Sequence, residues 1–289
     1  QGYRRPGRGV GALDPARHPG GDGRGVTVVD VEYSWQLNHE DLRIPASARI
    51  DANGKPFDPF YDTNHGTAVL GILFGIRNSY GVTGLVPKAT PRVASVYGAR
   101  GYSVARAVTR AATLLQPGDV ILIEQQAAVC GGDCEGGAGC GPVEWNQPEY
   151  DSIATATGLG IVVVEAAGNG SVDLDAPACR GRFDRTRRDS GAIIVGAGAP
   201  ETREKLAFSS YGSRVDVQGW GREVWTTGYG TAFDPGSVRR LYASDFSGTS
   251  SASPIVAGTV AAVQGALKAS GRRAATPKEM RSALVATGL

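Results

Sequence analysis

Five short runs of continuous apolar residues, separated by stretches with helical character, constrain the fold of this chain more than any other feature. The runs are Val26–Asp30, Val93–Tyr97, Val120–Glu124, Ile161–Glu165 and Ile193–Gly196. Most are rich in β-branched residues, as strands covered on both faces must be. The helical stretches are His65–Phe74, Ser103–Gln116, Pro148–Thr157 and Ser250–Ala269. This alternation predicts a three-layer α/β fold, with a mostly parallel twisted sheet and helices on both faces.

The rest of the chain suggests a simple organisation. Thr276 and Glu279 form a capping box around Pro277, which predicts a last helix that ends near Thr287. No linker or internal repeat divides the 289 residues, so we expect one domain over residues 1–289 that begins with an irregular arm of about 24 residues. The net charge of +2 and the absence of an 18-residue apolar run argue against nucleic acid and membranes as partners. We expect a monomer.

The cysteines indicate the compartment. Cys130, Cys134 and Cys140 crowd into one glycine-rich segment, and Cys179 lies far from them. A zinc site needs paired thiolates at short regular spacings, which these positions fit poorly. Two disulfides are the better interpretation, with zinc or free thiols as the alternatives. Disulfides predict an exported, extracellular protein.

Reactive side chains gather where these strands end and helices begin. Asp30 ends the first run, Asn169 follows the fourth, and His65 and Ser250 open two helices. In a parallel sheet such positions converge at the carboxyl ends of the strands. His65 can take the proton of a serine nucleophile, and a carboxylate such as Asp30 can orient the imidazole. The Asn169 amide and the Ser250 N–H can donate hydrogen bonds to an oxyanion.

The segments VVDVE, HGTAVLG, AAGNG and GTSSASP resemble the Asp, His, Asn and Ser signatures of the subtilisin-like serine proteases, in that family's chain order. The resemblance implies a secreted endopeptidase that cleaves protein or peptide substrates through an acyl-enzyme. It assigns Asp30 as orienting acid, His65 as base, Asn169 as oxyanion donor and Ser250 as nucleophile. It also implies that the chemistry needs no cofactor and that a propeptide can act as inhibitor. The alternative is a catalytically inactive module that binds peptides.

The resemblance also locates the substrate groove. Glu124, Gln125 and Gln126 align with the edge strand that pairs with the substrate, and Ala167 and Gly168 belong to the segment before the oxyanion donor. Backbone pairing with an extended substrate is compatible with these residues.

The acids near this groove bear on specificity. We expect Glu124 and Glu165 to lie close together near the primary pocket, with Asp173 and Asp175 at its floor. Such a pocket would favour Lys or Arg before the scissile bond. The competing expectation is a pocket for apolar side chains, in which arginines such as Arg180 and Arg182 neutralise the acids.

A structural calcium ion is a further possibility from the resemblance. Asp41, Asn78 and the carbonyls of Ile76, Tyr80 and Val82 resemble a ligand set of the family, and Ca²⁺ prefers such oxygen ligands. One carboxylate is thin ligation, and the eleven-residue interval from Asp30 to Asp41 is longer than in the family. A turn held without metal is the alternative.

The family fold places the Cys130–Cys140 segment and Cys179 on either side of the primary pocket. The resemblance therefore favours the pairing Cys130–Cys179 with Cys134–Cys140, one of three possible pairings.

Overall fold

The computed structural model describes residues 1–134 and 137–288. At its centre lies a parallel sheet with the strand order β2-β3-β1-β4-β7-β8-β9. The strands are β1 (Thr27–Glu32), β2 (Arg49–Ile50), β3 (Thr90–Ser95), β4 (Val120–Ile123), β7 (Val162–Ala166), β8 (Ile193–Gly198) and β9 (Val217–Trp220). The carboxyl ends of the three middle strands, β1, β4 and β7, therefore meet at one edge of the sheet.

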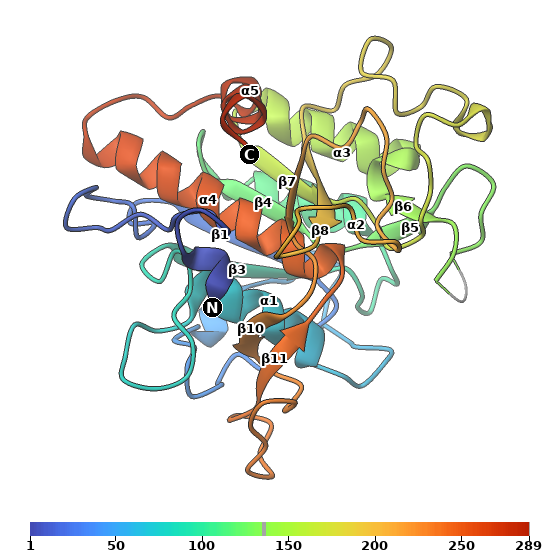
Figure 1. The fold of residues 1–289 in the computed structure, drawn as a ribbon. Coiled ribbons are helices and arrows are strands. Elements are labelled where there is room, and N and C mark those ends of the chain that lie inside the picture. The colour runs from blue at the N-terminus through green and yellow to red at the C-terminus, as the bar shows by residue number, and fades with distance from the viewer. Residues whose placement is uncertain (135–136, 289) are drawn as a thin grey trace.

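Helices cover both faces of this sheet, which confirms the predicted three-layer α/β fold (Figure 1). One face carries α2 (Val104–Ala112) and α3 (Gln147–Gly158). The other carries α1 (Asn64–Phe74) and α4 (Thr249–Ala269), and α4 crosses in front of the strands in Figure 1. The last helix, α5 (Pro277–Thr287), begins with the predicted capping box.

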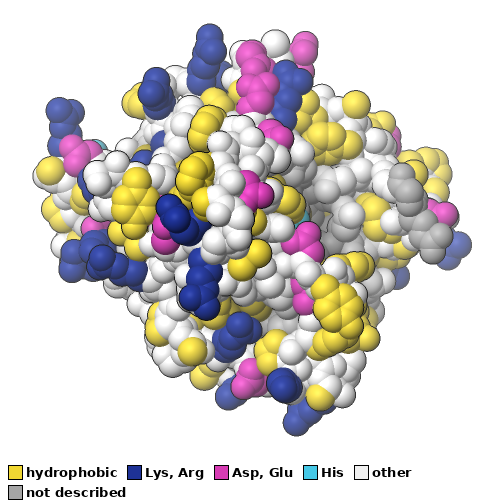
Figure 2. Space-filling view, turned by 90° about the horizontal axis from the view of Figure 1, so that it is seen from below, with side chains coloured by type: hydrophobic (Ala, Val, Ile, Leu, Met, Phe, Trp, Pro, Cys, Tyr) yellow, Lys and Arg dark blue, Asp and Glu magenta, His cyan; other side chains and the backbone are white. Residues whose placement is uncertain are grey.

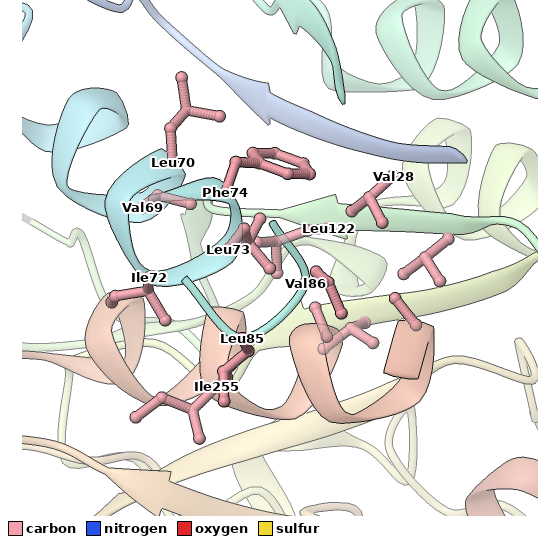
Figure 3. Packing of buried hydrophobic residues seen from close by; sticks show 14 of the residues in the cluster. Val28, Val69, Leu70, Ile72, Leu73, Phe74, Leu85, Val86, Leu122 and Ile255 are labelled. Atoms are coloured by element: carbon pink, nitrogen blue, oxygen red, sulfur yellow. The ribbon is translucent and has the colours of Figure 1, made fainter. Parts of the chain in front are cut away.

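Each face of the sheet has its own apolar core, because successive side chains of a strand point to opposite faces. Val28 and Leu122 pack with Leu73 of α1 and Ile255 of α4, as Figure 3 shows. Val29, the next residue of β1, belongs instead to the core beneath α2 and α3. The position of a side chain along its strand therefore decides which layer it joins.

All five predicted strands and all five predicted helices are present in the described residues, with ends that differ by a few positions. The apolar runs did not predict β2, β9 or two small antiparallel ribbons. One ribbon pairs β5 (Gln126–Ala128) with β6 (Cys140–Pro142), and the other pairs β10 (Val224–Thr227) with β11 (Tyr242–Phe246). These strands are short or partly polar, so they lack a continuous apolar run. Short 3₁₀ turns lie at Gly2–Arg4, Ala46–Ala48, Val143–Trp145 and Pro177–Cys179.

Both disulfides have the predicted pairing. Cys130 is bonded to Cys179, and Cys134 is bonded to Cys140. The Cys130–Cys179 bridge joins the segment just after β5 to the 3₁₀ turn at Pro177–Cys179. The Cys134–Cys140 bridge joins the connection between β5 and β6 to the start of β6. All four cysteines are thus used, and the zinc alternative is wrong.

The segment before β1 is fastened to distant parts of the chain. Tyr3 is fully buried. The Trp220 Nε1–H donates to the carbonyl of Arg8 at 2.9 Å, and Lys268 Nζ donates to the carbonyl of Gly25 at 2.9 Å. Within the described residues, no helix has the length and apolar character needed to cross a membrane.

Candidate active site

Three of the four predicted catalytic residues line a cleft of about 540 Å³ at the carboxyl edge of the sheet. The ends of β1, β4 and β7 and the first turns of α1 and α4 form its walls. His65, Asn169 and Ser250 all line it. Figure 2, the view from below, shows the molecule hollowed on this side, with acidic side chains along the rim.

His65 is paired with Glu32. Nδ1 of His65 lies 2.5 Å from Oε2 of Glu32, whose side chain is buried. Glu32 is the last residue of β1, since this strand runs two residues past the end that the apolar run predicts. His65 is the second residue of α1 and faces this strand end. The arrangement presents the imidazole to the cleft through its other nitrogen, Nε2.

The prediction that Asp30 orients His65 is wrong. Asp30 lies inside β1, fully buried, and its Oδ2 accepts a hydrogen bond from Trp35 Nε1 at 2.6 Å. Its Oδ1 has no partner within the described residues. Burial, followed by the charges of Glu32 and Glu124, raises the pKa of Asp30 well above its ordinary value, which favours the neutral form of this carboxyl group.

One sequence signal pointed to Glu32. The interval from Asp30 to Asp41 is eleven residues, longer than the family pattern, whereas the interval from Glu32 to Asp41 is nine. Asp30 and Glu32 also share one face of β1 because they are two residues apart. Either acid therefore faces the α1 side, and only the length of the strand decides which one reaches the cleft.

Several contacts hold the Glu32 carboxylate in place. Its Oε1 accepts hydrogen bonds from the Tyr33 N–H at 2.7 Å and from Gln125 Nε2 at 3.1 Å, which leaves Oε2 for His65. Phe246 packs edge-on against the His65 ring, with 5.6 Å between the ring centroids. Gln125, predicted to bind substrate, thus supports the acid as well as lining the cleft.

The charges around His65 favour its protonated form. Burial alone would lower the pKa of His65, but Glu32, and then Glu124 and Asp30, raise it to about 9. Glu124 is itself buried, and burial is the main reason that its pKa rises to about 8. The imidazole therefore becomes a free base only under alkaline conditions.

Asn169 and Ser250 carry N–H groups at the edge of the cleft. The Oδ1 of Asn169 accepts hydrogen bonds from the backbone N–H and the hydroxyl of Thr249, at 2.9 and 3.0 Å. This fixes the amide and leaves Nδ2 to donate into the cleft. Ser250 lies in the first turn of α4, where backbone N–H groups lack intrahelical acceptors. Gly248 before it has a φ of 103°, a conformation that suits glycine.

The predicted substrate-binding residues divide into two groups. Glu124, Gln125 and Gln126 line the cleft, and Gln126 Oε1 also accepts a hydrogen bond from the Asn169 N–H at 2.8 Å. Ala167 and Gly168 are buried behind the wall, because the chain there turns toward β8 and the Ala167 N–H bonds to Val195. Neighbouring Ala166 takes their place in the lining.

The expected pocket of four carboxylates does not form. Glu124 directly follows β4, and Glu165 is the residue before the last of the neighbouring strand β7. The two side chains point to opposite faces of the sheet, because Glu124 alternates in step with Leu122 of one core and Glu165 with Val163 of the other. Glu165 is fully buried and accepts a hydrogen bond from the Glu144 N–H at 2.9 Å.

The other two acids also lie outside the cleft lining. Asp175 accepts hydrogen bonds from the backbone N–H and the hydroxyl of Ser213, both at 2.7 Å, and Asp173 Oδ1 accepts one from the Asp175 N–H. Arg182 stacks over Trp145, with 5.1 Å to the ring centroid. Instead, Asp58 and Asp62 from the segment before α1 join Glu32 and Glu124 in the lining.

The proposed calcium ligands do come together, but their arrangement does not fit a cation. Both carboxylate oxygens of Asp41 accept hydrogen bonds, from Asn78 Nδ2 at 2.8 Å and from the Val82 N–H at 2.7 Å. The Oδ1 of Asn78 accepts one from the Tyr80 N–H, and the Ile76 N–H bonds to the Asp41 carbonyl. N–H donors thus face Asp41 where a cation would need oxygens. Within the described ranges, no cluster of three His, Cys, Asp or Glu side chains could hold a metal ion.

Sequence comparison relates the chain to known peptidases. A model of the subtilase family matches residues 23–288. Subtilisin Savinase from Lederbergia lenta is 32% identical over 84% of this chain and 77% of its own length, and thermitase from Thermoactinomyces vulgaris is 32% identical over 88% and 78%. Alkaline elastase YaB from Bacillus sp. (strain YaB) is 30% identical over 84% of this chain, which spans only 55% of that protein.

Solved structures share the fold. A cold adapted subtilisin-like serine proteinase superimposes with a TM-score of 0.63 over 92% of this chain and 82% of its own, at 20% identity. Fervidolysin from Fervidobacterium pennivorans, a keratinolytic enzyme related to subtilisin, gives 0.64 over 93% of this chain and 39% of its own, at 21% identity.

Proposed function

Because the chain belongs to the subtilase family, we propose that it is a serine endopeptidase with Glu32, His65 and Ser250 as its catalytic triad. The observation that carries this proposal is the 2.5 Å contact between His65 Nδ1 and Oε2 of the buried Glu32, in the cleft that Ser250 also lines. Glu32 orients the imidazole and stabilises its protonated form, as the acid of a Ser-His-acid triad does.

The reaction proceeds in two halves. Ser250 Oγ attacks the carbonyl carbon of the scissile peptide bond while its proton passes to His65 Nε2. The Asn169 Nδ2 and the Ser250 N–H donate to the resulting oxyanion. His65 then returns the proton to the leaving amine as the C–N bond breaks, which leaves an acyl ester on Ser250. Water, deprotonated by His65, hydrolyses this ester.

The substrate is an extended polypeptide segment, and cationic side chains are favoured. Glu32, Asp58, Asp62 and Glu124 line the cleft, and no Lys or Arg side chain is among its described lining residues. Matched peptides that carry Arg, Leu or Phe before the scissile bond test this preference. Equal or faster cleavage of the Leu or Phe peptide, compared by kcat/KM at low salt, would contradict it.

We also propose that residues 1–289 act as one secreted, monomeric peptidase domain. The two disulfides support an oxidising compartment. A propeptide inhibitor is proposed on the family relationship alone. Gel filtration of the purified chain tests the monomeric state.

A fluorophosphonate probe tests the nucleophile. We expect it to label Ser250, and we expect Ser250→Ala to lose both the label and peptide cleavage. Ser251→Ala is the matched control, because the Ser251 hydroxyl donates to Trp220 and Gly248 carbonyls and takes no part in the chemistry. Folded protein without a label on Ser250 would favour the inactive peptide-binding module.

A further inference from the structure

Glu124 is a buried carboxyl group in the cleft that the triad does not use. It follows β4, the strand next to β1. Only 5% of it is exposed, and its Oε1 accepts a hydrogen bond from the Ser253 hydroxyl at 2.5 Å. Its Oε2 is buried and has no hydrogen-bond partner among the described residues. Burying a carboxyl group in this way costs free energy of folding, and such groups are found more often at functional sites than elsewhere.

Glu124 shares the cleft with the reacting groups His65 and Ser250. Ser250 lies one helical turn before Ser253 on α4, so the two residues lie on the same side of this helix. The charge of the His65 imidazole and the Ser253 hydrogen bond stabilise the charged form of Glu124. In return, its charge stabilises the His65 imidazolium.

We propose that Glu124 takes part in catalysis through its charge: from the wall of the cleft that it shares with His65 and Ser250, it provides a second negative charge for the His65 imidazolium. This inference rests on the proposed protease function. As Ser250 Oγ bonds to the carbonyl carbon of the scissile peptide, its O–H bond breaks and the proton moves to His65 Nε2. The new positive charge then lies between Glu32 on its Nδ1 side and Glu124 on the Ser250 side. Glu124 accepts no proton in this step, because His65 takes the one proton that Ser250 loses.

The ionisable groups around Glu124 come from two elements: β1 contributes Asp30 and Glu32, and α1 contributes His65. The N-terminal end of α4, whose free N–H groups favour negative charge, adds the hydroxyls of Ser250 and Ser253. No Lys or Arg side chain is among the described residues that line the cleft. The charges of Glu124 and His65 influence each other's pKa, so the pH dependence of the reaction should depend on both groups.

The test is the pH dependence of kcat and KM for Glu124→Gln. This variant keeps the shape and an acceptor for Ser253 but removes the charge. We expect the acid limb of the kcat/KM profile to move about one unit toward lower pH and the limiting kcat to fall about tenfold, because one unit of imidazole pKa is a tenfold difference in proton affinity. KM should change little. Glu124→Asp, which restores the charge, should recover part of both effects.

Glu165→Gln is the matched control. It removes a buried carboxyl group from the adjacent strand but on the opposite face of the sheet, so the pH profile should stay that of the unmodified enzyme. Ser253→Ala provides a second variant if Glu124→Gln does not fold. Losing the Ser253 hydrogen bond makes the charged form of Glu124 less stable, so we expect a smaller shift in the same direction.

The outcomes separate this inference from the proposed function. An unmodified chain that neither reacts with the fluorophosphonate probe nor cleaves peptides contradicts the protease itself. An active chain whose folded Glu124→Gln variant keeps the original pH profile and kcat contradicts only the role of Glu124. A change confined to KM also contradicts it, since it would place Glu124 in ground-state binding.

Discussion

At the scale of single residues, the site contains two acids on β1, Asp30 and Glu32, which have different partners. Glu32 bonds to the imidazole, whereas Asp30 accepts a hydrogen bond from Trp35 and has a pKa raised by burial. We expect Glu32→Gln to lower kcat by about 10⁴-fold, because the amide cannot balance the imidazolium charge. Asp30→Asn leaves the contact between Glu32 and His65 in place and keeps an acceptor for Trp35, so it should lower kcat by less than about tenfold. Steady-state kinetics on both folded variants at one alkaline pH decides, and a loss for Asp30→Asn as large as that for Glu32→Gln would restore Asp30 as the orienting acid.

The oxyanion donor gives a second prediction at this scale. Asn169 is fixed through its Oδ1 by Thr249, so its Nδ2 is ready for charge that develops in the transition state. Asn169→Ala should lower kcat by about 10²–10³-fold with little change in KM. An effect on KM alone would show that the amide serves substrate binding.

At the scale of elements, the two disulfides should have different consequences. Cys130–Cys179 closes a separation of 49 residues and Cys134–Cys140 one of 6. In the loop-entropy description, replacing the first pair by serines costs about 4 kcal/mol of folding free energy and the second about 2 kcal/mol. Of the four cysteines, Cys134 alone lines the cleft. Replacing the Cys134–Cys140 pair should therefore raise KM more than it lowers kcat. Denaturant unfolding and kinetics check both; equal stability losses would contradict the loop-length argument.

The elements also show where sequence reasoning succeeds and fails. Continuous apolar runs marked the buried strands, and the capping box at Thr276 marked α5, because both signals are local. The end of β1 was misplaced, since Asp30 interrupts the apolar run and only the fold shows that the strand continues to Glu32. The sequence did not show that Glu124 and Glu165 point to opposite faces of the sheet. The register between β4 and β7 decides this, and the register is set by how the two strands pair.

At the scale of the whole molecule, the buried titratable groups set the pH dependence of stability. The pKa of His65 rises from 6.5 to about 9, so its stabilising effect is complete below pH 6.5 and is lost as pH rises through 9. Glu124 keeps its proton up to about pH 8 in the fold but only to about 4.5 when unfolded. In both cases the folded protein binds more protons, so stability falls with rising pH.

We therefore expect Tm to decrease between pH 5 and 9, and the decrease to be smaller in Glu124→Gln. Calorimetry at constant ionic strength measures both slopes. A Tm that rises over this range, or a slope in Glu124→Gln equal to that of the unmodified chain, would contradict this account of the buried charges.

Calcium should have no effect on the melting of the molecule. The oxygens of Asp41 and Asn78 already accept hydrogen bonds from N–H groups of their own loop, and a ligand raises Tm only by binding the folded state. Melting curves with calcium and with a chelator should coincide. A higher Tm with calcium would show that this loop rearranges around the ion.

The fastening of the arm before β1 has a consequence for folding during synthesis. Trp220 and Lys268, which hold Arg8 and Gly25, leave the ribosome more than 200 residues after them. β1 likewise pairs with β3 and β4, which follow it by some 60 and 90 residues. The first apolar strand therefore stays unpaired until β3 and β4 have been made, and the arm stays unfastened until most of the chain has been made. Pairings between such distant segments form slowly, and until they form, hydrophobic surface and unpaired strand edges remain exposed. The polypeptide needs protection from aggregation during this interval, before any cleft exists.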